Sequence, residues 1–243
     1  MISSVQPLPR GGAAAVMVPA PARTRLLGAA GGIVTGTRTR VPKGCVLYRE
    51  GDSLAAPYLV VSGVFRVVVR AATGKERLAD LAGPGDVLAT AVFDAGESTE
   101  TVVAASDAVV VTIDVQRTLA RPSGRRDLAA ALVKQLTRSR EMADDLGLPM
   151  GARICRILAR VADRLGDRVD DLPAANSDLV WRHLPFSLTH DDVALMAGCA
   201  RVTATRVLGE LKDAGVLHGH RGDYSVVPTA LDAAADHYVY EVL

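Results

Sequence analysis

The sequence predicts an α+β protein, with an antiparallel β sandwich or barrel followed by a largely helical second half. Between about residues 35 and 115, short runs rich in β-branched residues, such as VFRVVV and AVVVTI, alternate with glycine-containing turns. Many short strands at this spacing are typical of an antiparallel sandwich or barrel. Beyond residue 120, apolar residues recur at the three- and four-residue spacing of amphipathic helices. At a length of 243 residues, one or two domains are expected.

The chain divides into four segments by composition and pattern. Residues 1–33 are rich in Gly, Ala and Pro without a clear period, and are expected to form a flexible N-terminal segment. Residues 34–122 are expected to form the β domain, residues 123–147 a long helix, and residues 148–243 a mainly helical C-terminal domain.

The expected long helix carries one apolar stripe. Residues 125–146 contain no glycine or proline, and the stripe continues through Ser139 and Leu146. Its main apolar members are Leu128, Leu132, Leu136 and Met142. An amphipathic helix outside a compact sheet needs a partner that covers its apolar side. The same helix of a second copy is the economical solution, and these residues are therefore expected at a homodimer interface. Packing on the chain's own β domain is the alternative.

After a further expected helix over residues 152–165, residues 187–217 predict two helices joined by a tight turn at Gly198. Thr189 is the expected N-cap of the first helix, because its oxygen can accept a hydrogen bond from an otherwise unpaired N–H group. Four residues of the second helix are expected to pack inward: Ala204, Val207, Leu208 and Leu211. Arg201 and Arg206 are expected outside, where a guanidinium can bind the O6 and N7 atoms of guanine.

A hairpin is expected directly after these helices, in the stretch HGHRGDYSVV. Gly219 and Gly222 are its expected turn residues, and residues 229–243 are expected to form a closing helix. A helix-turn-helix followed by such a hairpin is a winged helix. The second helix of such a pair presents its N-terminal residues to base edges in the major groove of DNA. His220 and Arg221 in the hairpin are placed to contact phosphates.

Composition narrows the function and the location. The three cysteines, Cys45, Cys155 and Cys199, lie far apart and have no disulfide or metal spacing. No apolar run approaches the ~20 residues of a membrane span, so a cytoplasmic protein without a membrane partner is expected. The formal net charge is only +1, which gives DNA binding no support by itself. No phosphate loop, nucleophile elbow or metal motif is present, so the chain is not expected to be an enzyme.

The order of these elements resembles the Crp/Fnr superfamily of bacterial transcription regulators. The match over residues 35–228 is strongest in the helix-turn-helix, with its Gly-Cys turn and two arginines, and weaker at the β-domain glycines Gly44, Gly51, Gly63 and Gly85. The resemblance implies a cupin-like jelly roll of the cyclic-nucleotide-binding type as sensor and a dimerisation helix. It also implies a homodimer that binds a two-fold symmetric site in double-stranded DNA, with RNA polymerase as a further candidate partner.

The resemblance also assigns contacts on DNA. Base contacts are expected from Arg201, Val202, Thr203 and Arg206, and backbone contacts from Thr189, His220 and Arg221. Val202 departs from the family, which often has glutamate there. Since valine has no hydrogen-bonding side chain, the preferred base pair at that position is expected to differ.

The expected effector pocket departs further from the family. Members that bind cyclic nucleotides hold the ribose with an acid and the phosphate with an arginine followed by Ser or Thr. Counting from Gly85-Asp86, these positions become Thr90, Glu100 and Thr101, and no arginine occurs between Asp86 and Ile113. Cyclic AMP and cyclic GMP are therefore not expected as effectors, and no cofactor is expected.

Other inputs have little support in the sequence. An iron–sulfur sensor needs several N-terminal cysteines, but only Cys45 lies in the front half. A haem sensor is not expected either, because all five histidines lie in the C-terminal half. Cys199 is expected to serve close packing in the turn. The alternative function is a ligand-sensing or protein-interaction module whose winged helix contacts protein instead of DNA.

Overall fold

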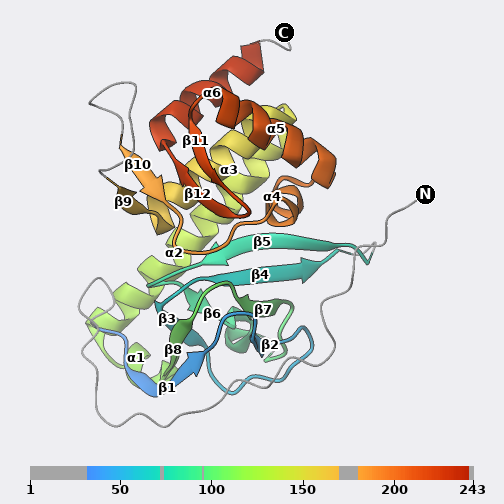
Figure 1. Ribbon diagram of the computed structural model, residues 1–243. Coiled ribbons are helices and arrows are strands. Elements are labelled where there is room, and N and C mark those ends of the chain that lie inside the picture. Colours follow the sequence, from blue (N-terminus) through green and yellow to red (C-terminus); the bar gives the residue numbers. More distant parts are fainter. Residues whose placement is uncertain (1–31, 72–73, 95, 170–179, 241–243) are drawn as a thin grey trace.

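The computed structural model describes residues 32–71, 74–94, 96–169 and 180–240 (Figure 1). The expected flexible segment lies, except for its last two residues, outside these ranges.

The N-terminal half is the predicted antiparallel β domain, built from two four-stranded sheets. One sheet has the order β1 (Thr35–Val41), β8 (Ala108–Ile113), β3 (Tyr58–Ser62), β6 (Val87–Leu88). The other has the order β2 (Val46–Tyr48), β7 (Thr101–Ala104), β4 (Phe65–Arg70), β5 (Glu76–Ala82). Side chains from both sheets, among them Tyr48, Phe65 and Val110, form a buried core between them. The short 3-10 helix η1 (Thr90–Phe93) follows β6.

Two helices lead away from the β domain. The short α1 (Val115–Leu119) precedes the long α2 (Pro122–Asp144), and a 3-10 turn, η2 (Asp145–Gly147), ends this segment. Proline suits the first turn of a helix, where its missing N–H would have no partner. The helix therefore begins at Pro122, one residue before the expected start at residue 123.

The apolar stripe expected on α2 is divided between two sides of the helix. Leu128 is only 4% exposed because it packs with Ile33, Leu59 and Val87 of its own β domain. Its place in a homodimer interface was therefore predicted wrongly, and the alternative of packing on the chain's own sheet holds for this residue. Leu132 packs at the edge of the same cluster.

A second side of α2 carries exposed apolar residues. Leu136 is 70% exposed, as expected for an interface residue, and Val133 beside it is 61% exposed. Met142 is half-buried and packs against the core of the C-terminal domain. The outward side thus runs through Ala129, Val133 and Leu136, at the four- and three-residue spacing of a coiled-coil seam, and continues to Ala143 seven residues after Leu136, with Arg140 between them.

The C-terminal domain combines four helices with a small antiparallel sheet. Its helices are α3 (Met150–Leu165), α4 (His190–Ala197), α5 (Arg201–Asp213) and α6 (Pro228–Tyr240). The sheet has the order β11 (Leu217–His220), β12 (Asp223–Val226), β10 (Trp181–His183), β9 (Asp167–Val169). The helices expected over residues 152–165 and 229–243 correspond to α3 and α6, which pack against each other (Figure 1).

The C-terminal domain rests on strands β4 and β5 of the β domain (Figure 1). Leu78 and Leu81 of β5 belong to one buried cluster with Leu158 of α3 and Val193 of α4. The approach is close at Gly83, where a Cβ atom would lie 2.2 Å from Leu165 Cδ2. The two domains therefore share part of their hydrophobic core. Among the described residues, no helix is both long and apolar enough to cross a membrane.

Candidate nucleic-acid interface

The first helix of the predicted helix-turn-helix, α4, begins at the expected N-cap. Thr189 Oγ1 accepts a hydrogen bond from the Asp192 amide at 3.1 Å, and the Thr189 amide donates to Asp192 Oδ2 at 2.9 Å. This reciprocal capping box satisfies two N–H groups that helix geometry leaves unpaired. Gly198 ends the helix with φ of 69°, a left-handed conformation that favours glycine. The predicted N-cap and turn are both confirmed.

The second helix, α5, presents its polar side to solvent as expected. The four residues expected to pack inward are all buried, and they are Ala204, Val207, Leu208 and Leu211. Arg201 and Arg206 are exposed, Val202 is 75% exposed, and Thr203 is half-buried. Four side chains at the start of one helix therefore stand together on the surface, which is the arrangement that a major-groove reader requires.

Each exposed arginine of α5 has an acidic partner. Arg201 Nη1 lies 3.2 Å from Asp191 Oδ2, and Arg206 pairs with Glu210 one turn later on the same helix. Exposed ion pairs are worth only about 0–1 kcal/mol, so the Arg201–Asp191 pair can give way to DNA at small cost. Asp191 and Glu210 also offset the positive charge of the two arginines, which would otherwise attract any phosphate backbone. The net charge of the whole chain is likewise low, at +1.

The hairpin expected after α5 is formed by β11 and β12, with His220 opposite Asp223. Arg221 and Gly222 at its tip have φ of 53° and 86°, the left-handed pair of a two-residue type I′ turn. A Cβ atom on Gly222 would lie 2.5 Å from Ser187 Oγ, so the turn packs closely on the segment before α4. His220 and Arg221 are exposed, beside the elements that carry the reading residues.

One residue that the sequence did not single out joins all three elements. His190 Nδ1 lies 2.8 Å from Thr205 Oγ1 on α5, and its Nε2 lies 2.9 Å from the Tyr224 hydroxyl on β12. Burial, followed by the nearby Lys212 and Arg201, lowers the pKa of His190. The ring therefore ties α4 to α5 and to strand β12 of the hairpin.

A buried ion pair connects the interface to the β domain. Arg66 on β4 donates from Nε to Asp192 Oδ1 at 2.8 Å and from Nη2 to Asp192 Oδ2 at 2.7 Å. The same Nη2 donates to the Ser187 carbonyl at 2.6 Å. Because Asp192 also caps α4, the β domain holds the helix-turn-helix at its first turn.

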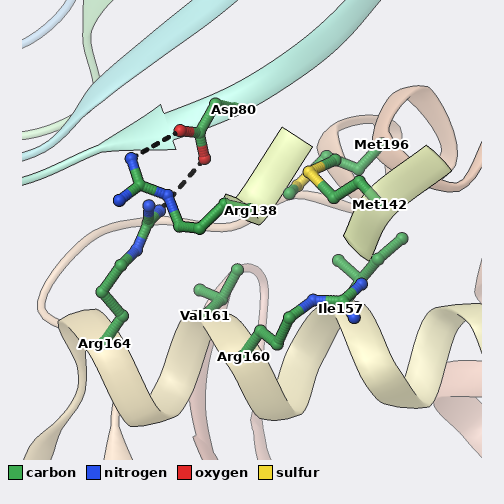
Figure 2. Close-up of a pocket in the computed structure, with 8 residues that line it drawn as sticks. All are labelled: Asp80, Arg138, Met142, Ile157, Arg160, Val161, Arg164 and Met196. Atoms are coloured by element: carbon green, nitrogen blue, oxygen red, sulfur yellow. Dashed lines mark hydrogen bonds and ion pairs between the residues drawn. The ribbon is translucent and has the colours of Figure 1, made fainter. Parts of the chain in front are cut away.

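A second charged cluster lies where β5, α2 and α3 meet (Figure 2). Asp80 accepts hydrogen bonds from Arg138 of α2 at 3.0 Å and from Arg164 of α3 at 3.2 Å. Burial alone would raise the pKa of Asp80, but the two guanidinium groups outweigh it and hold this pKa below its usual value. Asp86 also pairs with Arg138 at 3.0 Å and with Arg164 at 3.7 Å, so two carboxylates join the β domain to α2 and α3.

The expected effector pocket is organised around a carboxylate. The Tyr48 hydroxyl donates to Glu100 Oε1 at 2.6 Å and accepts from the Ala89 amide at 2.7 Å, just before Thr90. Burial raises the pKa of Glu100, and its hydrogen bonds only partly oppose this. Thr101 Oγ1 accepts from the Glu50 amide at 3.1 Å. These groups do not fit a cyclic phosphate, because a phosphate placed there would meet a carboxylate instead of a guanidinium.

This architecture, a double-sheet β domain joined by a long helix to a winged helix, defines a class of two-domain regulators. Comparison with protein families agrees with it. Residues 38–120 match the cyclic nucleotide-binding domain, and residues 152–232 match the Crp-like helix-turn-helix domain. The chain belongs to the Crp/Fnr superfamily of transcription regulators.

Individual relatives and solved structures are similar but distant. The CRP-like cAMP-activated global transcriptional regulator of Mycobacterium tuberculosis is 23% identical over 180 residues, which cover 72% of this chain and 76% of that protein. The cyclic AMP receptor protein of Thermus thermophilus is 29% identical over 199 residues, 80% of this chain and 85% of the relative. FixK2 from Bradyrhizobium japonicum has a similar fold, with a TM-score of 0.65 and 20% identity, covering 83% of this chain and 97% of that one.

Proposed function

We propose that this transcription regulator acts as a homodimer on double-stranded DNA and recognises a two-fold symmetric operator. The observation that carries the proposal is the start of α5, where Arg201, Val202 and Arg206 are exposed on a helix whose other side is buried. Thr189, His220 and Arg221 would hold the phosphate backbone on either side of that helix. Half-sites would lie about one helical turn, roughly 34 Å, apart.

The exposed seam of α2 supports the dimer. Val133 and Leu136 leave most of their apolar surface in water, and burying a leucine side chain stabilises by about 1.5–3 kcal/mol. Because a two-fold axis brings each residue to the interface twice, the same seam on a second copy gives a self-complementary contact. The inner side of α2 is already covered by the chain's own domains.

We propose further that neither cyclic AMP nor cyclic GMP is the effector of this protein. Two relatives are named for cyclic AMP, but the residues of this chain argue against that effector here. Counted without gaps from Gly85-Asp86, Glu100 takes the position of the family's phosphate-binding arginine, and its carboxylate accepts a hydrogen bond from Tyr48. Isothermal titration calorimetry of the full chain with cyclic AMP is expected to show no binding at micromolar concentration. Micromolar affinity would overturn this part of the proposal.

DNA binding is tested with operators selected from random duplexes. Phosphate contacts make affinity fall steeply between 50 and 200 mM salt, on the order of tenfold or more. Arg206→Ala is expected to lower affinity for the selected operator by about 5- to 150-fold, the loss of one bidentate base contact. Arg117→Ala, at an arginine of α1 that is 77% exposed, is the matched control. An affinity for DNA that changes neither with salt concentration nor on Arg206→Ala would favour a protein-interaction module instead.

A further inference from the structure

Arg206 is connected to the far side of its own domain through Glu210. The Glu210 carboxylate has two oxygens and uses them on different elements. Oε1 accepts from the Arg206 guanidinium on α5, and Oε2 accepts from the Tyr238 hydroxyl on α6 at 2.7 Å. Arg206 is 62% exposed and Glu210 is 40% exposed. A solvent-facing arginine is thus linked to the closing helix by a single carboxylate.

Tyr238 is a fixed end for this chain of contacts. Its ring packs on Gly151 at the start of α3, where a Cβ atom would lie 2.5 Å from ring atom Cδ1. The ring also contacts the buried core of the domain. Burial, together with the hydrogen bond to Glu210, raises the pKa of Tyr238, so the hydroxyl remains a donor. The position of Glu210 Oε2 is therefore set by packing between α3 and α6.

This arrangement affects how an arginine reads a base. A long arginine side chain loses considerable rotamer freedom when it is held in one place, and an intrahelical pair alone offsets little of that loss. Glu210 is held from its other oxygen, so it can keep the guanidinium oriented before DNA arrives. Its negative charge also weakens the pull of Arg206 toward any phosphate, which favours base contacts over generic backbone contacts.

The geometry points to Tyr238 and Glu210 as specificity-determining positioning residues that hold Arg206 for base recognition. This inference rests on the proposed DNA-binding function. It adds that contacts behind Arg206 increase the preference of α5 for one DNA sequence over others. It assigns α6, through Tyr238, a part in sequence recognition although that helix carries none of the expected DNA contacts.

Tyr238→Phe removes only the hydroxyl, and Tyr240→Phe on the same helix is the matched control, since Tyr240 is 76% exposed. Fluorescence anisotropy would measure the affinity of each full-length variant for the selected operator and for a scrambled duplex. Tyr238→Phe is expected to lower the ratio of these affinities about three- to tenfold, the range that one lost hydrogen bond supports. Tyr240→Phe is expected to leave the ratio unchanged.

The same measurement in an Arg206→Ala background separates positioning from a general structural role. With Arg206 absent, Tyr238→Phe is expected to have no further effect on the ratio. An equal loss in both backgrounds would overturn the inference, as would an unchanged ratio in Tyr238→Phe alone. A wild-type chain with no sequence preference would overturn the proposed function as well, so the two failures are distinguishable.

Gly151→Ala provides a second route to the same residue. Alanine is the better helix former, but its Cβ would force the Tyr238 ring to move. The variant is expected to lose selectivity as Tyr238→Phe does while circular dichroism shows the folded chain. Retained selectivity in a folded Gly151→Ala protein would contradict the role of the ring.

Discussion

Removing Arg66 tests whether the β domain holds the helix-turn-helix. Arg66→Ala deletes the bidentate bond to Asp192 and the bond to the Ser187 carbonyl, with distances of 2.6–2.8 Å. The Arg66 and Asp192 side chains are only 20% and 10% exposed. The variant therefore leaves a largely buried carboxylate without its countercharge.

The size of the effect follows from this burial. Removing one partner of a buried ion pair costs about 3–5 kcal/mol. Asp192 keeps its bonds to Thr189, so we expect a loss of free energy of unfolding near the lower end, about 3 kcal/mol. Arg66→Lys keeps the charge but cannot form the bidentate pair, and is expected to lose less. Arg117→Ala, which removes an exposed pair with Asp114, is expected to cost no more than about 1 kcal/mol.

Urea unfolding followed by tryptophan fluorescence measures this loss directly. Trp181 is the single tryptophan, lies in β10 of the C-terminal domain and is 6% exposed. Its signal therefore reports the domain that Arg66 holds. If Arg66→Ala costs no more than Arg117→Ala, the pair contributes nothing beyond a surface contact, and the reasoning about domain docking is refuted.

Three further predictions concern the β domain, helix α5 and the exposed seam of α2. Because the pKa of Glu100 is raised, its ionisation costs stability as the pH rises above the usual glutamate pKa of about 4.3. Glu100→Gln is therefore expected to stabilise the fold at pH 7 and to match the stability of the wild type near pH 4. Thermal unfolding across this pH range measures the difference, and a variant less stable than the wild type at every pH would contradict the prediction. Val202→Glu is expected to shift the selected operator toward cytosine at one base pair per half-site, and an unchanged operator would exclude a base contact at this position. Leu136→Asp is expected to raise the dimer dissociation constant, measured by sedimentation equilibrium, at least about 100-fold, because roughly 3 kcal/mol of apolar burial is lost over the two copies. The control is Leu119→Asp on α1, where Leu119 is 44% exposed, and this variant is expected to leave the dimer intact.

The segments with a strong local pattern were predicted well. The run VFRVVV corresponds to β4, AVVVTI to β8, and the capping residue Thr189 and the turn at Gly198 bound α4 as expected. In contrast, β1 has the polar sequence TGTRTRV and becomes a strand only by pairing with β8. Strands β9 and β10 are three residues each, too short to show a period.

Contacts between residues far apart in the chain could not be predicted from the sequence. Arg66 and Asp192 are 126 positions apart, and Tyr48 and Glu100 are 52 apart, so no local spacing connects them. The stripe on α2 shows a related difficulty. A helix that packs on its own domain and also exposes a seam has apolar residues on two sides, so Leu128 and Leu136 fit one stripe by spacing although only one of them is exposed. The exposed positions of Arg201, Val202 and Arg206 could be predicted because these residues lie within one short, regular helix whose apolar side is plain in the sequence.

The measurement that tests the central claim most directly is selection of duplexes by the purified full-length chain, followed by footprinting of the selected site. A dimer that reads DNA with α5 is expected to select a palindrome whose half-sites are about 10 base pairs apart centre to centre, and to lose it on Arg206→Ala. A non-palindromic motif, or a selected site that Arg206→Ala binds equally well, would contradict the account.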